Sequence, residues 1–164
     1  MPPAARVTDP VQHPLPPMLT PGPGSPNVMI GYLPAWRGVP LAAVAALQAA
    51  KQAADIAIQA AESATKAAAG TPGAPAAYAA EQATKASVLA SMSSMISGAS
   101  GGADIHACTT PLPVPPHGPG VDITGSATVM INNLPAGRQN DTILEAAGPS
   151  NQISMGCSTV IIGG

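Results

Sequence analysis

Short apolar runs bounded by glycine and proline recur near both ends of the chain. The runs NVMI, TVMI and TVII lie at 27–30, 128–131 and 159–162. Short segments rich in β-branched residues between turn residues are typical of strands. In each run a valine and an isoleucine are two positions apart, and alternation along a strand predicts that they share one side. These pairs are Val28/Ile30, Val129/Ile131 and Val160/Ile162.

The residue inside each pair is apolar as well: Met29, Met130 and Ile161. A strand that is apolar on both sides is either covered on both faces or offers one face to a partner. The pattern therefore leaves two alternatives, a small core that is covered completely or an exposed apolar face for docking.

The segment 41–100 has another pattern, dominated by alanine with Gln, Lys, Glu and Ser. Its two halves run from Pro40 to Gly70 and from Pro75 to Gly98, and proline at a first turn and glycine at an end are helix boundaries. We predict an antiparallel helical hairpin, with helices about 40 and 35 Å long at the usual rise per residue.

Charged residues four apart support two helices that are exposed on one face. These pairs are Lys51/Asp55, Glu62/Lys66 and Glu81/Lys85, and an apolar stripe is formed by Val88, Leu89, Met92, Met95 and Ile96. We expect the helices to pack mainly on each other, with contact to another protein as the alternative. The recurring charges argue against a membrane span.

The strand runs belong to a longer repeat that contains the motif P-A-x-R. The copies of this motif are PAARVTD at 3–9, PAWR at 34–37 and PAGRQND at 135–141. The longer matches are GSPNVMIGYLPAWR at 24–37, GSATVMINNLPAGR at 125–138 and the shortened GCSTVIIGG at 156–164. We predict an α+β fold in which a small β-rich domain, formed by 1–40 and 101–164, is interrupted by the hairpin at 41–100.

Composition limits what can hold this domain together. The chain has 20 prolines, 17 glycines, no phenylalanine and 9% charged residues, and a weak core makes a staple such as a metal more valuable. Six scattered basic residues and a net charge of −2 argue against nucleic-acid binding, which needs a clustered basic footprint. The start MPPAARVTDP does not have the pattern of a signal peptide. With only two cysteines, we expect synthesis in a reducing cytoplasm, where metal binding is favoured over a disulfide.

The stretch HACTTPLPVPPHGPG at 106–120 collects metal-binding side chains. We predict a metal site formed by His13, His106, Cys108 and His117. One thiolate and three imidazoles suit tetrahedral Zn²⁺, and four protein ligands leave no position for a catalytic water. Such a site would be structural and would stabilise a proline-rich tip that has few backbone hydrogen bonds.

The repeat places a polar side chain four residues after an aspartate in each copy. The pairs are Asp9/His13, Asp104/Cys108 and Asp141/Glu145. We expect Glu145 to be solvated, because the other donors complete four ligands, with the alternative that it replaces one of them. Cys157 is expected to be a small buried residue, with the alternative that it replaces Cys108. A further alternative is that the histidines are only polar loop residues.

An enzyme is a rival hypothesis, in which three ligands leave the zinc open and Glu145 or Asp104 acts as the base. Four available ligands would close the zinc site, and the cluster has few other polar groups beside it, so we expect no catalysis.

The order of these motifs resembles that of PAAR-repeat proteins. The resemblance rests on PAAR (3–6), GSPNVMIG (24–31), LPAWR (33–37), PHGPG (116–120), GSATVMINNLPAGR (125–138) and GCSTVIIGG (156–164). It covers roughly 1–40 and 101–164 and leaves out the helical segment.

The resemblance implies a β-rich cone that caps the trimeric VgrG-type spike of a bacterial type VI secretion system, with relatives on contractile phage tails. It implies a zinc held by three histidines and one cysteine near the apex, which hardens the tip for membrane piercing and effector delivery. The protein would wait in the bacterial cytoplasm and leave with the apparatus. Met29, Met130 and Ile161 are then candidates for the docking base. The hairpin would be part of the structure or an adaptor for a toxin effector or chaperone.

Overall fold

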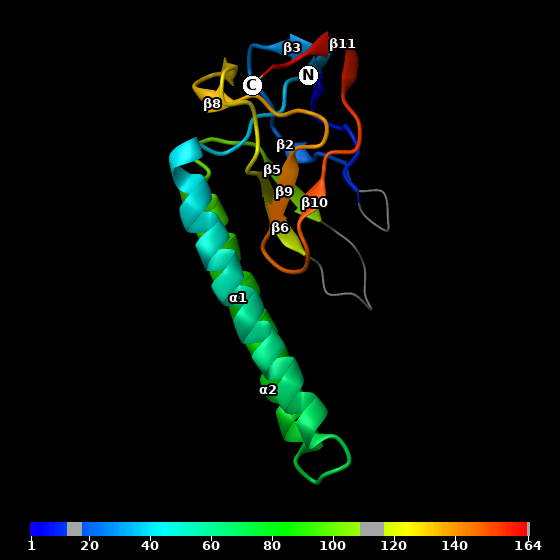
Figure 1. Ribbon diagram of the computed structural model, residues 1–164, viewed down its shortest axis with the longest axis vertical. Helices are drawn as coiled ribbons and strands as arrows, with labels where there is room; N and C mark the ends of the chain where they lie inside the picture. Colours follow the sequence, from blue (N-terminus) through cyan, green and yellow to red (C-terminus); the bar gives the residue numbers. More distant parts are fainter. Residues whose placement is uncertain (13–17, 109–116, 164) are drawn as a thin grey trace.

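The computed structural model describes residues 1–12, 18–108 and 117–163 (Figure 1). Its elements are β1 (Pro3–Ala4), β2 (Pro21–Gly22), β3 (Met29–Ile30), β4 (Leu33–Pro34), α1 (Leu41–Ala68), α2 (Ala74–Ala99), β5 (Ile105–Cys108), β6 (Gly118–Asp122), β7 (Met130–Ile131), β8 (Leu134–Pro135), β9 (Thr142–Glu145), β10 (Asn151–Gln152) and β11 (Cys157–Ile161). Two long helices and many short antiparallel strands confirm the expected α+β class.

The strands form two groups along the long axis of the molecule. The pairs β1–β11, β3–β4 and β7–β8 lie together at one end, which we call the base (Figure 1). A five-stranded sheet in the order β10-β9-β6-β5-β2 follows below the base. The hairpin runs beside the sheet and continues past it, away from the base (Figure 1).

The three P-A-x-R motifs are joined in a closed ring of backbone hydrogen bonds. The amide of Ala5 donates to Gly137, that of Gly137 to Trp36, and that of Trp36 back to Ala5, each at 2.9 Å. The preceding alanines, Ala4, Ala35 and Ala136, are completely buried in one apolar cluster. The sequence repeat is therefore a repeat in space, with the three alanines in one shared cluster around an approximate threefold axis.

Each copy of the motif also contains one arginine–aspartate ion pair. The pairs are Arg6–Asp9, Arg37–Asp104 and Arg138–Asp141, with nitrogen–oxygen distances of 2.8, 2.8 and 3.1 Å. In every copy the aspartate amide donates to the arginine carbonyl, and the arginine amide donates to the aspartate carboxylate. The hairpin is thus inserted in the tight turn between Arg and Asp of the second copy, and the turn closes around it.

The three strand runs place one apolar residue inside and one outside. Ile30, Ile131 and Ile162 are 5–8% exposed and lie in the same cluster as the alanines. Met29, Met130 and Ile161 are about half exposed, at 57, 48 and 48%. The alternative that these strands belong to a completely covered core is therefore wrong. The expected pairs are also only half right, because Val129 and Val160 are exposed at 36%.

The helical hairpin is confirmed close to its expected bounds. Lys51–Asp55 and Lys85–Glu81 form the expected ion pairs within one helix. Glu62 differs, since it pairs with Lys85 of the other helix at 2.8 Å and thereby ties α1 to α2. By length and composition alone, α1 is apolar enough to cross a membrane, with a mean hydropathy of 1.3 over 18 residues. The charges in α1 therefore do not exclude a membrane span by themselves.

The half of the hairpin nearest the base shares its core with the strands. Leu47, Met92 and Ile96 are at most 2% exposed and pack in one cluster with Val121 and Leu144 of the sheet. Met95, on the same expected stripe, is 43% exposed. The inserted helices and the discontinuous β-rich part are separate in sequence, but they are joined by this continuous core.

Candidate metal centre

The central sheet presents two rows of side chains, one on each face. Ile105 on β5, Val121 on β6 and Leu144 on β9 are paired across the strands and face the hairpin core. On the other face, His106 is paired with Gly120, and Gly120 with Glu145. Both His106 and Glu145 are completely buried.

Glycine at position 120 explains how these two side chains meet across an intervening strand. A Cβ atom there would lie 2.8 Å from Ile143 Cγ2 and 3.1 Å from Glu145 Cγ, closer than side chains tolerate. Without it, His106 Nε2 and Glu145 Oε1 approach to 3.9 Å. The absence of a side chain at Gly120 therefore lets the side chains of β5 and β9 approach each other above β6.

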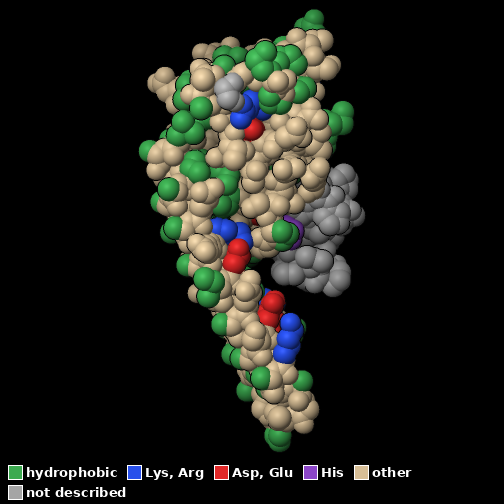
Figure 2. Space-filling model, in the orientation of Figure 1, with side chains coloured by type: hydrophobic (Ala, Val, Ile, Leu, Met, Phe, Trp, Pro, Cys, Tyr) green, Lys and Arg blue, Asp and Glu red, His purple; other side chains and the backbone are tan. Residues whose placement is uncertain are grey.

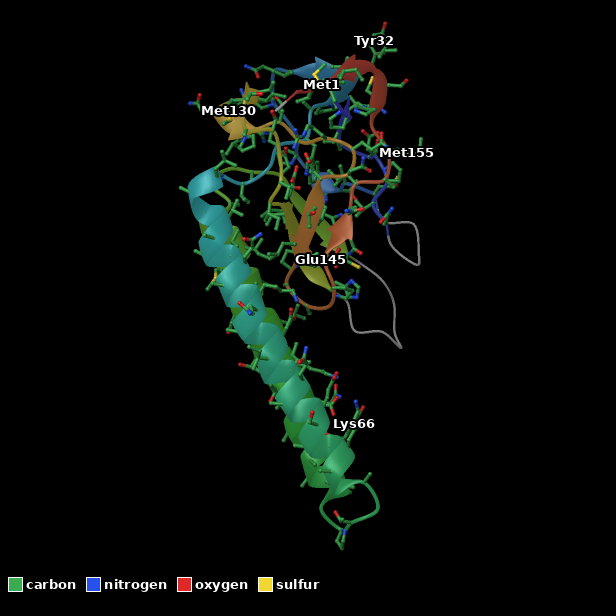
Figure 3. The ribbon with its side chains drawn as sticks, viewed as in Figure 1. Met1, Tyr32, Lys66, Met130, Glu145 and Met155 are labelled. Carbon is green, nitrogen blue, oxygen red and sulfur yellow. The ribbon has the colours of Figure 1, made fainter. Side chains whose placement is uncertain are left out.

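Glu145 lies at the centre of this space. Its Oε2 is 2.7 Å from His117 Nδ1, and its Oε1 accepts a hydrogen bond from Asn151 Nδ2 at 2.6 Å. Figure 3 shows Glu145 in the sheet, well away from Met130 at the base. His106, Glu145 and Asn151 lie on β5, β9 and β10, and His117 directly precedes β6, so four strands position these side chains.

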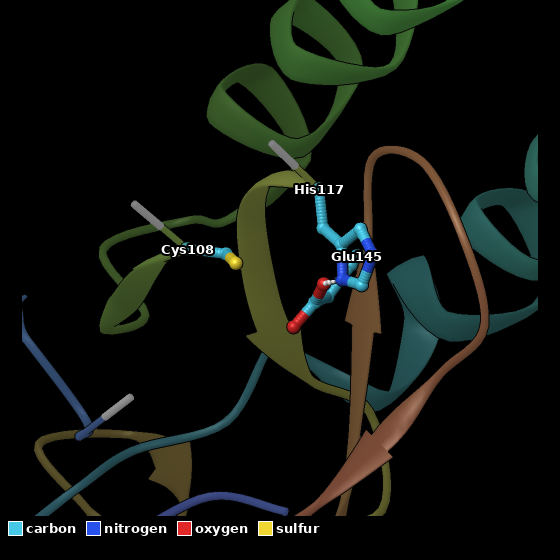
Figure 4. A group of neighbouring side chains, drawn as sticks. All are labelled: Cys108, His117 and Glu145. Atoms are coloured by element: carbon cyan, nitrogen blue, oxygen red, sulfur yellow. Dashed lines mark ion pairs between the residues drawn. The ribbon is translucent and has the colours of Figure 1, made fainter. Parts of the chain in front are cut away.

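Cys108 and His117 complete a group that could hold a metal ion. One ligand atom each from Cys108, His117 and Glu145 lies within 4.8 Å of the others. Figure 4 shows the three side chains pointing toward one another, with Nδ1 of the imidazole next to the carboxylate. Cys108 follows His106 by two positions on β5 and is likewise buried, as expected for side chains on one face of a strand.

The outer edge of His117 faces the loop after β9 and the hairpin. A Cβ atom on Gly148 would lie 3.0 Å from His117 Nε2, so this loop covers the ring closely. Beyond it, His117, Pro149, Ile58 and Leu89 help to line a cavity of about 450 Å³. The hairpin therefore forms one wall next to the candidate metal group.

The structure bears differently on each of the residues that were predicted to bind zinc. Cys108 and His117 come together, and His106 is buried beside them. His13 lies outside the described residues. The expectation that Glu145 is solvated is wrong, because its side chain is completely buried between two strands and accepts hydrogen bonds there.

Cys157 is buried at the base, on β11, as expected of a small core residue. It pairs with Ala4, and its sulfur contacts Thr159 Oγ1 at 3.2 Å. This hydroxyl contact lowers the pKa of the thiol. Cys157 is not in the group that Cys108 joins, so among the described residues Cys108 is the thiol of this centre.

The position of Glu145 in the repeat was the available signal for its role. It lies four residues after an aspartate, as Cys108 does. Asn151 carried no comparable signal, because it is not at a repeat position and reaches the site through the β9–β10 pairing.

The donor set suits a thiophilic divalent cation. Thiolate, imidazole and carboxylate all bind Zn²⁺, and four-coordinate sites without an open position are structural. Asp104, which was a candidate base, has both oxygens occupied by Arg37 and by the amide of Gly24. No protein-family model, no curated protein and no solved structure matches this chain.

Proposed function

We propose that this protein is a structural cap of the PAAR-repeat kind, which sits on the end of a VgrG-type trimeric spike in a contractile injection apparatus. The observation that carries the proposal is the approximate threefold ring of P-A-x-R motifs. A single chain with this arrangement offers three equivalent contacts to a threefold partner. Such matching of symmetry allows each spike subunit to meet a similar surface.

The base provides the surface for that contact. Met29, Met130 and Ile161 project from equivalent strands and are about half exposed. Tyr32 lies on the same end and is 97% exposed (Figure 3). Exposed apolar side chains gathered on one face are typical of interaction sites.

The test is co-purification with the trimeric spike from the same bacterium. The triple variant Met29→Lys, Met130→Lys, Ile161→Lys should no longer co-purify with the spike. Its thermal unfolding temperature should stay the same, because these side chains lie outside the core. The matched control places three lysines on the exposed hairpin surface, at Ile56, Tyr78 and Met95, and should still co-purify with the spike. Retention of the spike by the base variant would overturn the proposed docking face.

A structural metal ion in the buried group would stiffen the sheet below the base. When bound, the ion would tie Cys108 on β5 to His117 and Glu145 near β6 and β9. These residues hold the loops around the sheet in fixed positions, and Asn151 orients the carboxylate by its hydrogen bond. No proton transfer or bond cleavage is assigned to this group, and the protein is proposed to act mechanically.

An adaptor role for the hairpin is the second candidate, favoured by its extension past the sheet (Figure 1). The near half belongs to the shared core, so deletion of 41–100 would unfold the protein rather than test recruitment. A shorter hairpin, with 63–81 replaced by a glycine-rich turn, preserves Leu47, Met92 and Ile96. Loss of effector export with spike binding retained would assign recruitment to the far half, and unchanged export would remove the adaptor role.

A further inference from the structure

The base contains two short β-hairpins from two copies of the repeat, and their turns differ in sequence. Gly31 and Tyr32 join β3 to β4, and Asn132 and Asn133 join β7 to β8. The strands of both hairpins pair in the same register, so Tyr32 and Asn133 occupy equivalent positions. In the third copy the equivalent residue of the sequence is Gly164. Tyrosine therefore occurs at this position in one copy only.

The backbone of these turns disfavours a tyrosine. The φ angles are 54° and 67° at Gly31 and Tyr32, and 53° and 63° at Asn132 and Asn133. Two-residue hairpin turns with positive φ at both positions are of type I′, which favours glycine, asparagine and aspartate. A bulky side chain in this left-handed region is a genuine outlier, because its Cβ atom lies too close to the following carbonyl oxygen. Tyr32 is therefore placed where the turn itself would favour another residue.

Packing within the chain explains the first residue of each turn but not Tyr32. A Cβ atom on Gly31 would lie 3.1 Å from Cys157 Sγ, so a larger residue would crowd this sulfur. Asn132 Oδ1 accepts a hydrogen bond from Ser25 Oγ at 2.7 Å and thereby ties its turn to the neighbouring copy. The side chain of Tyr32 is 97% exposed and projects from the end of the base (Figure 3). A backbone cost at such an exposed position indicates a contact made outside the chain.

We propose that Tyr32 is the anchor by which the base docks, and this inference rests on the proposed threefold spike. The ring enters an apolar pocket at the end of one spike subunit, in which a polar atom pairs with the hydroxyl group. Tyrosine is enriched among the residues that dominate interface energies, since it supplies a large and rigid contact area. Met29, on the strand that precedes the turn, is 57% exposed and continues the same docking surface.

The approximate threefold arrangement of the base predicts how many such pockets the partner has. A threefold spike offers the same pocket on each of its subunits, whereas the cap carries one tyrosine at these turns. Tyr32 therefore fills one pocket, and the two other pockets face turns without an aromatic side chain. The tyrosine thereby holds the cap in one of three equal rotational positions and prevents intermediate ones.

The first experiment measures binding of the purified trimeric spike from the same bacterium to the immobilised native protein and to Tyr32→Asn. This substitution copies the residue at the equivalent turn position, and asparagine tolerates a positive φ. We expect the variant to bind the spike at least about tenfold more weakly, with a thermal unfolding temperature equal to or above that of the native protein. Tyr78→Asn, at a tyrosine that is 57% exposed on α2, is the matched control and should bind as the native protein does. Native affinity in Tyr32→Asn would overturn the inference.

A second variant moves the tyrosine to the equivalent turn. Tyr32→Asn combined with Asn133→Tyr places the ring at an exposed position of the β7–β8 hairpin. Because the pockets repeat around the spike axis, the cap can rotate to the next position and should regain most of the lost affinity. A folded double variant that binds as weakly as Tyr32→Asn would overturn the proposed pocket on each subunit.

The same measurements separate this inference from the proposed function. If the native protein does not bind the spike at all, the proposed function itself fails. Loss of binding in the triple lysine variant of the base, together with native affinity in Tyr32→Asn, would keep the docking face and remove only the role of Tyr32.

Discussion

The ion pair between Arg37 and Asp104 closes the repeat around the hairpin, and its removal should be unusually costly. The two residues are 67 positions apart, whereas the corresponding residues in the other copies are three apart. Their side chains are 8% and 0% exposed, compared with 20% and 6% for Arg6 and Asp9. The second copy therefore depends on a buried, long-range pair where the first depends on a local and more solvated one.

The hydrogen bonds of Asp104 indicate what a substitution would leave behind. Its Oδ1 accepts from Arg37 Nη2 and the Gly24 amide, and its Oδ2 accepts from Arg37 Nε and the Arg37 amide. Arg37→Met removes both side-chain donors and leaves a buried carboxylate without its counter-charge. Breaking such a pair costs about 3–5 kcal/mol, while Arg6→Met, at a partly exposed pair, should cost about 1–2 kcal/mol.

The assay is urea or thermal unfolding followed by circular dichroism. For a chain of this length about 2–4 °C are lost per kcal/mol, so Arg37→Met should lower the midpoint by roughly 6–20 °C. The double variant Arg37→Met, Asp104→Asn should recover part of that loss, because the amide leaves no buried charge. Equal destabilisation by Arg37→Met and Arg6→Met, or no recovery in the double variant, would refute the argument.

Three further predictions concern the shared core, a buried acid and the metal. Met92→Ala should cost about 2–5 kcal/mol in urea unfolding, whereas Met95→Ala should change stability by less than about 0.5 kcal/mol; similar costs would contradict a core shared between hairpin and sheet. Burial, together with the Asp141 carboxylate, raises the pKa of Asp122 well above its usual range, so stability falls as pH rises through the raised pKa. Asp122→Asn should therefore stabilise the protein at about pH 8 more than at about pH 4, and equal effects in melts at both pH values would contradict this. Adding Zn²⁺ at about 1,000 times its Kd should stabilise the chelated protein by about 4 kcal/mol, and an unchanged melting temperature would remove the structural role of the ion.

The hairpin was predictable from sequence because its signals are local. Alanine-rich composition and the flanking prolines and glycines place both helices within a few residues of their observed bounds. The partner of Glu62 was not predictable in this way, since Lys66 and Lys85 are equally suitable in chemistry. The choice depends on how the two helices face each other, which brings Lys85 within 2.8 Å.

The repeat also predicted the arrangement of the base, but only in part. Periodicity placed Ile30 and its equivalents on one side, and the structure buries them. It could not show that Met29 and its equivalents would remain uncovered, because that depends on which other elements pack there. The expected two-residue spacing of His106 and Cys108 on one strand face was sufficient to place both inside.

Glu145 was misjudged because its environment is created by strands distant in sequence. Counting four ligands from loops made a fifth donor unnecessary, and an acidic residue is normally solvated. The pairing of β5, β6 and β9 changes this, because Gly120 has no side chain to separate His106 from Glu145. A glycine that faces a carboxylate on the neighbouring strand of a sheet has no recognisable pattern in a linear sequence.

Few charges interrupt the face of the molecule shown in Figure 2, and most of them lie along the hairpin rather than on the base. In this view the hairpin therefore carries more of the charge than the base does. Lys85 forms two ion pairs on the hairpin. The pair with Glu62 joins α2 to α1, whereas the pair with Glu81 lies within α2.

The hairpin points away from the base, and this direction decides which part of the proposed cap would lie farthest from the spike. Along the long axis Met130 lies at the base, Glu145 in the sheet and Lys66 near the far end of the hairpin (Figure 3). A cap docked through its base would therefore present the turn between α1 and α2 beyond the metal group. Leu89 of α2 packs so closely on Gly118 that a Cβ atom there would lie 2.6 Å away. Because His117 directly precedes Gly118, a metal that fixes this imidazole would also fix the strand on which α2 packs. The ion would then act by fixing the part of the sheet that supports the hairpin, and not by hardening the end of the molecule that is farthest from the spike.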